Sequence, residues 1–90
     1  MANPITTTGT TTPISTTHQS GESISAWVKR HDDAVEASTV SGNTLTTTWT
    51  SSGATKTVIT TRQRDETDSD FKDRHVFAYL LQMIEEPPVP

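Results

Sequence analysis

An arginine–histidine pair occurs twice in this chain at a fixed spacing. Arg30-His31 is repeated 44 residues later as Arg74-His75. An imidazole can bind a metal ion or move a proton near neutral pH. The His31 and His75 pair is therefore a candidate site for metal binding or proton transfer.

The residues around this histidine pair do not complete a metal site. A metal ion needs three or four ligands at short distances. Only Glu22 and Glu66 recur as further ligand types, and each precedes its histidine by more than roughly two helical turns. We therefore expect His31 and His75 to pack on aromatic side chains, each with a ring nitrogen hydrogen-bonded, and we expect no metal or other cofactor.

The repeated arginines predict ion pairs. Arg74 could pair with Asp70 one turn earlier, but Arg30 has Ala26 at that position. A partner common to both copies must lie elsewhere, and the opposite copy's glutamate, Glu22 or Glu66, is the candidate. A site that binds an anion through bidentate arginine contacts is the alternative.

Gln19 and Gln63 are also matched between the copies, just before the expected helices. Together with the matched glutamates they are expected to hydrogen-bond the bend that leads into each helix. A helix N-terminus can also bind an anionic ligand. The acidic residues around the second N-terminus, Asp65, Asp68 and Asp70 among them, argue against that use.

Residues for catalysis are not apparent. The chain has no Gly-x-Ser-x-Gly nucleophile motif and no glycine-rich phosphate loop. Asp32 and Asp33 are adjacent, so their side chains would point about 100° apart on a helix and cannot act as a carboxylate pair. We expect a protein without enzymatic activity.

The elements that carry these residues follow from an internal repeat, which indicates one supersecondary unit used twice. Residues 5–35 align with residues 49–79 without a gap. The identical positions in the first copy are Thr6, Gly9, Thr11, Thr16, Thr17, Gln19, Glu22, Ser25, Arg30, His31 and Ala34. Each copy is expected to form a hairpin followed by a helix.

The second hairpin is expected to join strands over 45–50 and 55–62, with Gly53-Ala54 as a type II′ loop. That register places Trp49 opposite Val58. The same rule makes Gly9-Thr10 the loop of the first hairpin and places Ile5 opposite Ile14. Because Pro4 and Pro13 lie in this first hairpin, its opening strand is expected to lie at an edge of the sheet or to be partly disordered.

Ser23 and Thr67 are expected to cap the two helices. The first helix should end near Ala37 or Ser38, and the second near Glu86, before Pro87-Pro88. The predicted fold is α+β: two tandem ββα units, 5–40 and 45–86, form a four-stranded antiparallel sheet with both helices on one face and a pseudo-twofold axis. Residues 87–90 form a proline-rich tail, and the whole chain is one domain. A dimer in which the halves are exchanged between chains is the alternative.

Composition narrows the possible partners. The chain has 90 residues, 30% of them hydrophobic, no cysteine and a formal net charge of −4. Without a cluster of lysine and arginine, nucleic-acid binding is disfavoured. No long apolar run and no signal-peptide pattern occur, so we expect a cytoplasmic protein with no membrane segment.

The second helix carries more apolar residues than a thin sheet can cover. The excess is Phe77, Leu80, Leu81 and Ile84. Such exposed apolar surface is typical of an interface. We therefore expect a small non-enzymatic structural or interaction module that binds a protein partner or itself, with a homodimer possible. The alternative is a protein that binds a metal or a small ligand through His31 and His75.

Overall fold

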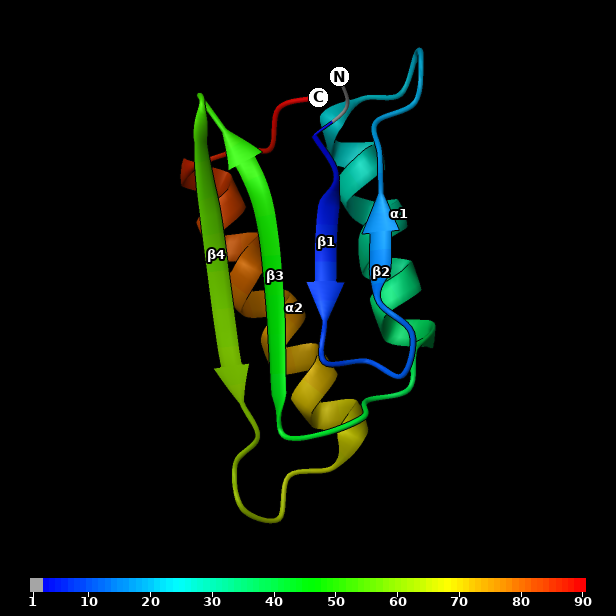
Figure 1. Cartoon of the computed structure of the whole chain (residues 1–90), viewed down its shortest axis with the longest axis vertical. Helices are drawn as coiled ribbons and strands as arrows, with labels where there is room; N and C mark the ends of the chain where they lie inside the picture. Colours follow the sequence, from blue (N-terminus) through cyan, green and yellow to red (C-terminus); the bar gives the residue numbers. More distant parts are fainter. Residues whose placement is uncertain (1–2) are drawn as a thin grey trace.

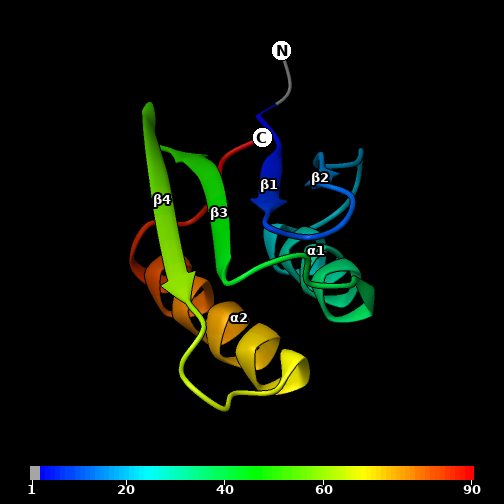
Figure 2. The ribbon, with the colours of Figure 1, turned by 60° about the horizontal axis from the view of Figure 1, so that its bottom comes forward.

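The computed structural model describes residues 3–90, which form a four-stranded antiparallel sheet and two α-helices (Figure 1). The elements are β1 (Ile5–Thr8), β2 (Ile14–Thr16), α1 (Ile24–Ala37), β3 (Thr44–Ser51), β4 (Ala54–Thr61) and α2 (Asp68–Glu85). Both helices lie against the same face of the sheet (Figure 2). The predicted α+β class, with four antiparallel strands and two helices, is confirmed.

The strand order is β2-β1-β3-β4, so the expectation that β1 lies at an edge is wrong. Pro4 stands just before the first residue of β1 and occupies no position in its ladder. Pro13 likewise stands just before β2, which is the edge strand and has only three residues. Proline thus limits the length of the strands here and does not decide which strand lies at the edge.

The strands of the second hairpin pair in a register that differs by two residues from the predicted one. Ser52 and Gly53 form the loop, both with positive φ (49° and 84°), as in a type I′ turn and not in the expected type II′. Trp49 therefore lies opposite Lys56, and Val58 lies opposite Thr47. A shift of two residues keeps every side chain on its predicted face, so the hydrophobic pattern could not distinguish the two registers.

The strand register of the first hairpin also differs by two residues from its prediction. Ile5 lies opposite Thr16 and Ile14 lies opposite Thr7, so Ile5 and Ile14 are not partners. The strands are joined by a longer connection over 9–13 that includes an isolated bridge between Thr10 and Val40. The predicted two-residue loop at Gly9-Thr10 is therefore wrong.

Both helices begin as the sequence predicts. The Ser23 hydroxyl accepts from the Ala26 N–H, and the Thr67 hydroxyl accepts from the Asp70 N–H. These bonds satisfy backbone donors that have no partner within the helix. Neither helix is long and apolar enough to span a bilayer, within the part of the chain that the structure describes.

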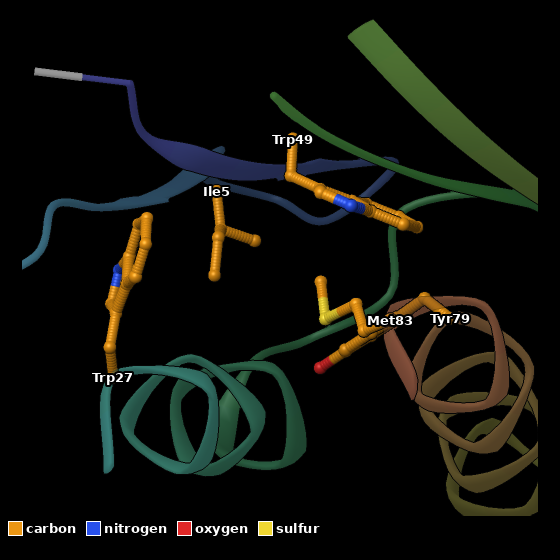
Figure 3. Packing of buried hydrophobic residues seen from close by; sticks show 5 residues of the cluster. All are labelled: Ile5, Trp27, Trp49, Tyr79 and Met83. Carbon is orange, nitrogen blue, oxygen red and sulfur yellow. The ribbon is translucent and has the colours of Figure 1, made fainter. Parts of the chain in front are cut away.

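The core lies between the sheet and the two helices. Its largest side chains come from different elements: Ile5 from β1, Trp27 from α1, Trp49 from β3, and Tyr79 and Met83 from α2. Figure 3 shows Ile5 between the two indoles. Each indole N–H donates to a backbone carbonyl, from Trp27 to Thr16 at 3.2 Å and from Trp49 to Glu86 at 2.8 Å. The core therefore leaves neither polar tip unpaired.

The C-terminal tail folds back onto the sheet. The Val89 N–H donates to the Thr50 carbonyl at 2.9 Å, and Pro88 is buried. This segment lies beside β3 just beyond the N-terminal end of β1, where the Asn3 side chain also donates to the Pro90 carbonyl. The tail thereby covers the end of the core that holds Trp49.

The close approach of Gly9 to β3 yields a stability prediction. A Cβ on Gly9 would lie 2.0 Å from the Thr44 carbonyl oxygen, and its φ is +97°. We expect Gly9→Ala to lower the free energy of unfolding by about 2–4 kcal/mol, because β3 must move and the backbone is strained. Urea titration of both proteins measures this.

Gly42→Ala is the matched control. A Cβ on Gly42 would meet no atom within 4 Å, and the φ of this residue is not positive. Its substitution should change the unfolding free energy by no more than about 0.5 kcal/mol. Equal effects of the two substitutions would contradict the proposed close contact.

Candidate functional site

His31 and His75 lie in one continuous chain of buried hydrogen bonds that crosses the middle of the sheet. Both histidines are fully buried, at 0% exposure. The chain, which we call the Thr–His chain, runs in the order Thr16, His31, Thr7, Thr47, His75, Thr60. The repeated histidines thus form one connected polar unit.

The contacts on the two sides of this unit are the same. His31 Nε2 lies 2.7 Å from Thr7 Oγ1, and its Nδ1 lies 2.9 Å from Thr16 Oγ1. His75 Nε2 lies 2.7 Å from Thr47 Oγ1, and its Nδ1 lies 2.8 Å from Thr60 Oγ1. All four ring nitrogens are therefore occupied by hydroxyl groups.

The two sides meet at a single bond between threonines. Thr7 Oγ1 lies 2.7 Å from Thr47 Oγ1, and both side chains are fully buried. Tyr79 stands beside the chain, and its ring packs edge-on against both His31 and His75. The Tyr79 hydroxyl in turn donates to Asp32 on α1. The sequence predicted aromatic neighbours and bonded nitrogens for the histidines, but not a connection between them.

The Thr7–Thr47 bond fixes the histidine tautomers. A neutral imidazole carries one N–H and one lone pair, and a hydroxyl donates only once. If both rings carried the proton on Nδ1, both threonines would donate to Nε2 and no proton would remain for the bond between them. If both carried it on Nε2, one buried hydroxyl proton would have no acceptor. Only opposite tautomers satisfy every group.

We therefore expect one Nδ1–H and one Nε2–H histidine in the folded protein. Two-dimensional ¹⁵N–¹H correlation spectra of the imidazole rings distinguish these forms. Two rings with the same tautomer pattern would contradict the continuous chain. Thr7→Val should remove the constraint while leaving the Thr47–His75 contact in place.

Burial keeps both histidines neutral. Desolvation, followed by the charges of Arg30 and His75, lowers the pKa of His31 to about 4. Desolvation, followed by the charge of Arg74, lowers the pKa of His75 to about 4. The ordinary pKa of histidine is 6.5. Neither ring can therefore act as a proton carrier near neutral pH in the folded state.

These lowered pKa values predict acid sensitivity. Because the unfolded chain binds protons on these rings more readily, the stabilisation is complete above about pH 6.5 and is lost as pH falls toward 4. We expect a loss of about 3 kcal/mol per histidine across this range. Urea unfolding at a series of pH values measures it.

His31→Leu with His75→Leu provides the comparison. The double variant should be less stable at pH 7 by about 1–3 kcal/mol per site, because threonine hydroxyls lose their partners. Its stability should, however, depend much less on pH between 6.5 and 4. An unchanged slope would show that other groups cause the acid sensitivity.

The repeated arginines form bidentate ion pairs within each half. Arg30 Nε and Nη2 each lie 2.9 Å from an oxygen of Glu22, and the corresponding distances from Arg74 to Glu66 are 2.8 Å. Glutamate is the expected partner, but the expectation that it comes from the opposite half is wrong. The pairs are local because the bend before each helix brings the glutamate back beside the helix.

Each of these ion pairs fastens a helix to the strand before it. Arg30 also donates to the Thr17 carbonyl at 2.6 Å, and Arg74 donates to the Thr61 carbonyl at 2.7 Å. Hydrogen bonding from the arginine is the main reason that the pKa values of Glu22 and Glu66 fall to about 2. With its fork already occupied, neither guanidinium offers a bidentate anion site.

Gln19 and Gln63 act through their backbones. Their N–H groups donate to Glu22 Oε1 and Glu66 Oε1, each at 3.0 Å. Their carbonyls accept from the N–H groups of the same glutamates. The matched glutamines thus mark a tight turn before each helix, as expected.

The apolar residues expected at an interface lie at the C-terminal half of α2. Phe77, Leu81 and Ile84 are 64%, 51% and 77% exposed, respectively. Leu80 is only partly buried and packs against the core, so it is not part of this exposed set. We call Phe77, Leu81 and Ile84 the α2 ridge.

A groove of about 410 Å³ adjoins the α2 ridge. It lies between the N-terminal half of α1 and the C-terminal end of α2, and its apolar walls come from Ile24, Val28, Leu80, Met83 and Ile84, with Pro87 and Pro88 of the tail. Lys29 and Asp32 stand at its border. The ridge and the groove share Ile84, so they form one continuous apolar surface.

Sequence reasoning missed the four threonines of the Thr–His chain. Thr16 and Thr60 are matched in the repeat, which was an available signal. Thr7 and Thr47 are 40 residues apart, so an alignment at a constant offset of 44 does not match them with each other.

His18 was also missed. It donates to the Glu22 carbonyl as Arg62 donates to the Glu66 carbonyl.

Comparison of the chain with protein-family models, with curated proteins and with solved structures finds no match. Among residues 3–90, no group of three or more histidine, cysteine, aspartate or glutamate side chains is placed to hold a metal ion. The function must therefore be inferred from the geometry of this chain.

Proposed function

We propose that this protein is a non-enzymatic interaction module that forms a homodimer through the outer surface of its helices. The observation that carries the proposal is the α2 ridge. Phe77, Leu81 and Ile84 recur at i, i+4 and i+7 and lie on the side of α2 opposite its core residues. A continuous apolar surface of this kind typically marks an interface.

A second copy fits this surface because the surface has two complementary parts. The α2 ridge projects, while the adjoining groove between α1 and α2 is hollow. In a twofold dimer, a residue of the ridge in one copy contacts the groove of the other, and the reverse contact follows by symmetry. Each copy would therefore bury both parts at once.

The geometry of the histidines favours this proposal over the metal-binding alternative. Both nitrogens of His31 and both nitrogens of His75 are hydrogen-bonded to threonine hydroxyls inside the core. A metal ion would have to displace these bonds and enter a fully buried position. The Thr–His chain is better suited to fixing the arrangement of the sheet and the helices.

We further propose that the two ββα halves are tandem copies related by a pseudo-twofold axis through the Thr7–Thr47 bond. Support comes from the β1–β3 register, in which Thr6 faces Thr48 and Thr8 faces Thr46 on either side of that bond. In this correspondence β1 matches β3 at an offset of 40, whereas β2 and the helix match at 44. The two offsets differ by four because the second hairpin is four residues longer than the first.

A cytoplasmic location, the absence of a nucleic-acid partner and a single domain over residues 1–90 remain predictions. So does the exchange of halves between chains, which would preserve the same contacts. None of these bears on the surface proposed for dimerisation.

The dimer is tested by charge substitution on the ridge. Leu81→Glu with Ile84→Glu places two carboxylates on the proposed apolar interface, so the double variant should lose the interaction made there. Sedimentation equilibrium of the wild type and the variant over a concentration series measures the change. Association should weaken by at least about 100-fold, since burying an unpaired charge costs several kcal/mol.

Ala26→Glu with Ser69→Glu is the matched control. Both positions are exposed and helical, and both lie outside the ridge and the groove. This control adds the same two charges and should associate as the wild type does. An unchanged association constant for Leu81→Glu with Ile84→Glu, or equal losses in both variants, would refute the helix interface.

A further inference from the structure

The second feature without a partner in the described chain is the outer edge of β4. β4 is the last strand in the order β2-β1-β3-β4, and it has eight residues (Figure 1). The opposite edge, β2, has only three residues. A long edge strand presents a row of N–H and C=O groups that can pair with another strand.

The hairpin register identifies which backbone groups point outward. In a two-residue hairpin the residues that flank the loop, here Ser51 and Ala54, form a hydrogen-bonded pair, and such pairs then alternate along the ladder. The Arg62 N–H donates to the Asn43 carbonyl at 2.7 Å, which continues the same alternation. The even-numbered residues of β4 therefore bond to β3, and the odd-numbered residues point outward.

The outward groups belong to four β-branched residues, which favour extended backbone. They are Thr55, Thr57, Ile59 and Thr61. The outward carbonyl of Thr61 already accepts from Arg74 Nη2 at 2.7 Å, so the open part of the edge is centred on Thr55, Thr57 and Ile59. Among residues 3–90, no other strand pairs with this edge. β4 also contains no proline, and it pairs with β3 along its whole length without a bulge. β4 therefore lacks the proline, the bulge and the short length that usually protect an edge strand from pairing.

The one charge on β4 does not protect the edge. Lys56 points toward the helix side of the sheet and forms an ion pair with Glu86 at 3.1 Å. A lysine protects an edge strand when its charge must be buried on pairing. Here the charge already has a partner within the same chain.

We propose that β4 pairs antiparallel with β4 of a second copy, joining two sheets into one of eight strands. This surface is distinct from the helix interface proposed above. Hydrogen-bonded pairs must join odd-numbered residues, and the register with the fullest overlap places Val58 opposite Val58 of the second copy. In that register Thr57 faces Ile59, and Thr55 faces Thr61.

Charge and apolar surface both favour a second copy as the occupant of the edge. In this register Lys56 faces Thr60 and Arg62 faces Ala54 of the other chain, so no two like charges lie opposite each other. Ile59, which is 64% exposed, comes within diagonal contact of Ile59 of the second copy. It is the one strongly exposed large apolar residue among those described that lies outside α2.

Amide hydrogen exchange tests the proposal at single residues. In the dimer, the N–H groups of Thr55, Thr57, Ile59 and Thr61 become protected as the protein concentration rises. Where nine-tenths of the chains are paired, exchange should slow by about tenfold. The measurement is made on the Leu81→Glu/Ile84→Glu protein as well as on the wild type, so that failure of the helix interface leaves this test intact.

Thr57→Pro removes one outward N–H without touching the ladder to β3. It should abolish the concentration-dependent protection of Thr55 and Ile59. Thr57→Val retains the N–H and the β-branched shape, and it should pair as the wild type does. Circular dichroism establishes that each variant is folded.

Ile59→Lys provides a second test should Thr57→Pro fail to fold. Made in the Leu81→Glu/Ile84→Glu protein, it places two like charges in diagonal contact across the pair and should weaken the remaining association by at least tenfold. Thr48→Lys adds the same charge to the same face of the sheet on the central strand β3, away from the edge, and should have no such effect. Exchange at the four amides that is fast at every concentration, or association unaltered in both Thr57→Pro and Ile59→Lys, would overturn the proposal.

Discussion

The hydrogen bond between Thr7 and Thr47 is the contact on which the rest of the interior depends. It joins the two central strands on the face that the helices cover, and each threonine also bonds to a histidine from one helix. A buried polar group without a partner would cost about 1–3 kcal/mol. The bond therefore couples the register of β1 and β3 to the positions of α1 and α2.

This coupling shows what the two buried histidines contribute to the fold: their hydrogen bonds fix the alignment of the two central strands. Apolar side chains at these positions would tolerate a shift of one strand along another, because apolar packing is not directional. A chain of hydroxyl and imidazole groups tolerates no such shift, since every bond depends on the same alignment. Stability near neutral pH then relies on rings that lose their neutral form when the solution becomes acidic.

Sequence reasoning predicted the elements of this fold well and their pairing poorly. Caps at Ser23 and Thr67 and the periodic apolar residues located both helices, because these signals are local. The hairpin registers were wrong by two residues in both halves, because a two-residue shift leaves the buried face unchanged. The connection between β1 and β2 is also longer than the two-residue loop between β3 and β4, which a gapless alignment of the two hairpins could not show.

For the candidate site, too, the sequence identified the residues but not the contacts between them. His31 and His75 were found from the repeat, but their threonine partners depend on the β1–β3 register, which no local pattern specifies. Glu22 and Glu66 were identified as ion-pair partners, yet the choice of half depended on a bend whose geometry is set by the Gln19 and Gln63 backbones. Local patterns thus identified the histidines and glutamates, whereas the strand register and the bend before each helix determine which residues they contact.

The inner stripe of α2 explains why its outer residues remain exposed. Phe71, His75, Tyr79 and Met83 recur every four residues and fill the side that faces the sheet. Phe77 and Leu81 fall between them in sequence, so they point away from the core on any regular helix. No repacking of a single chain can bury both stripes against one sheet. The exposed apolar surface is therefore a consequence of the sequence of α2 itself.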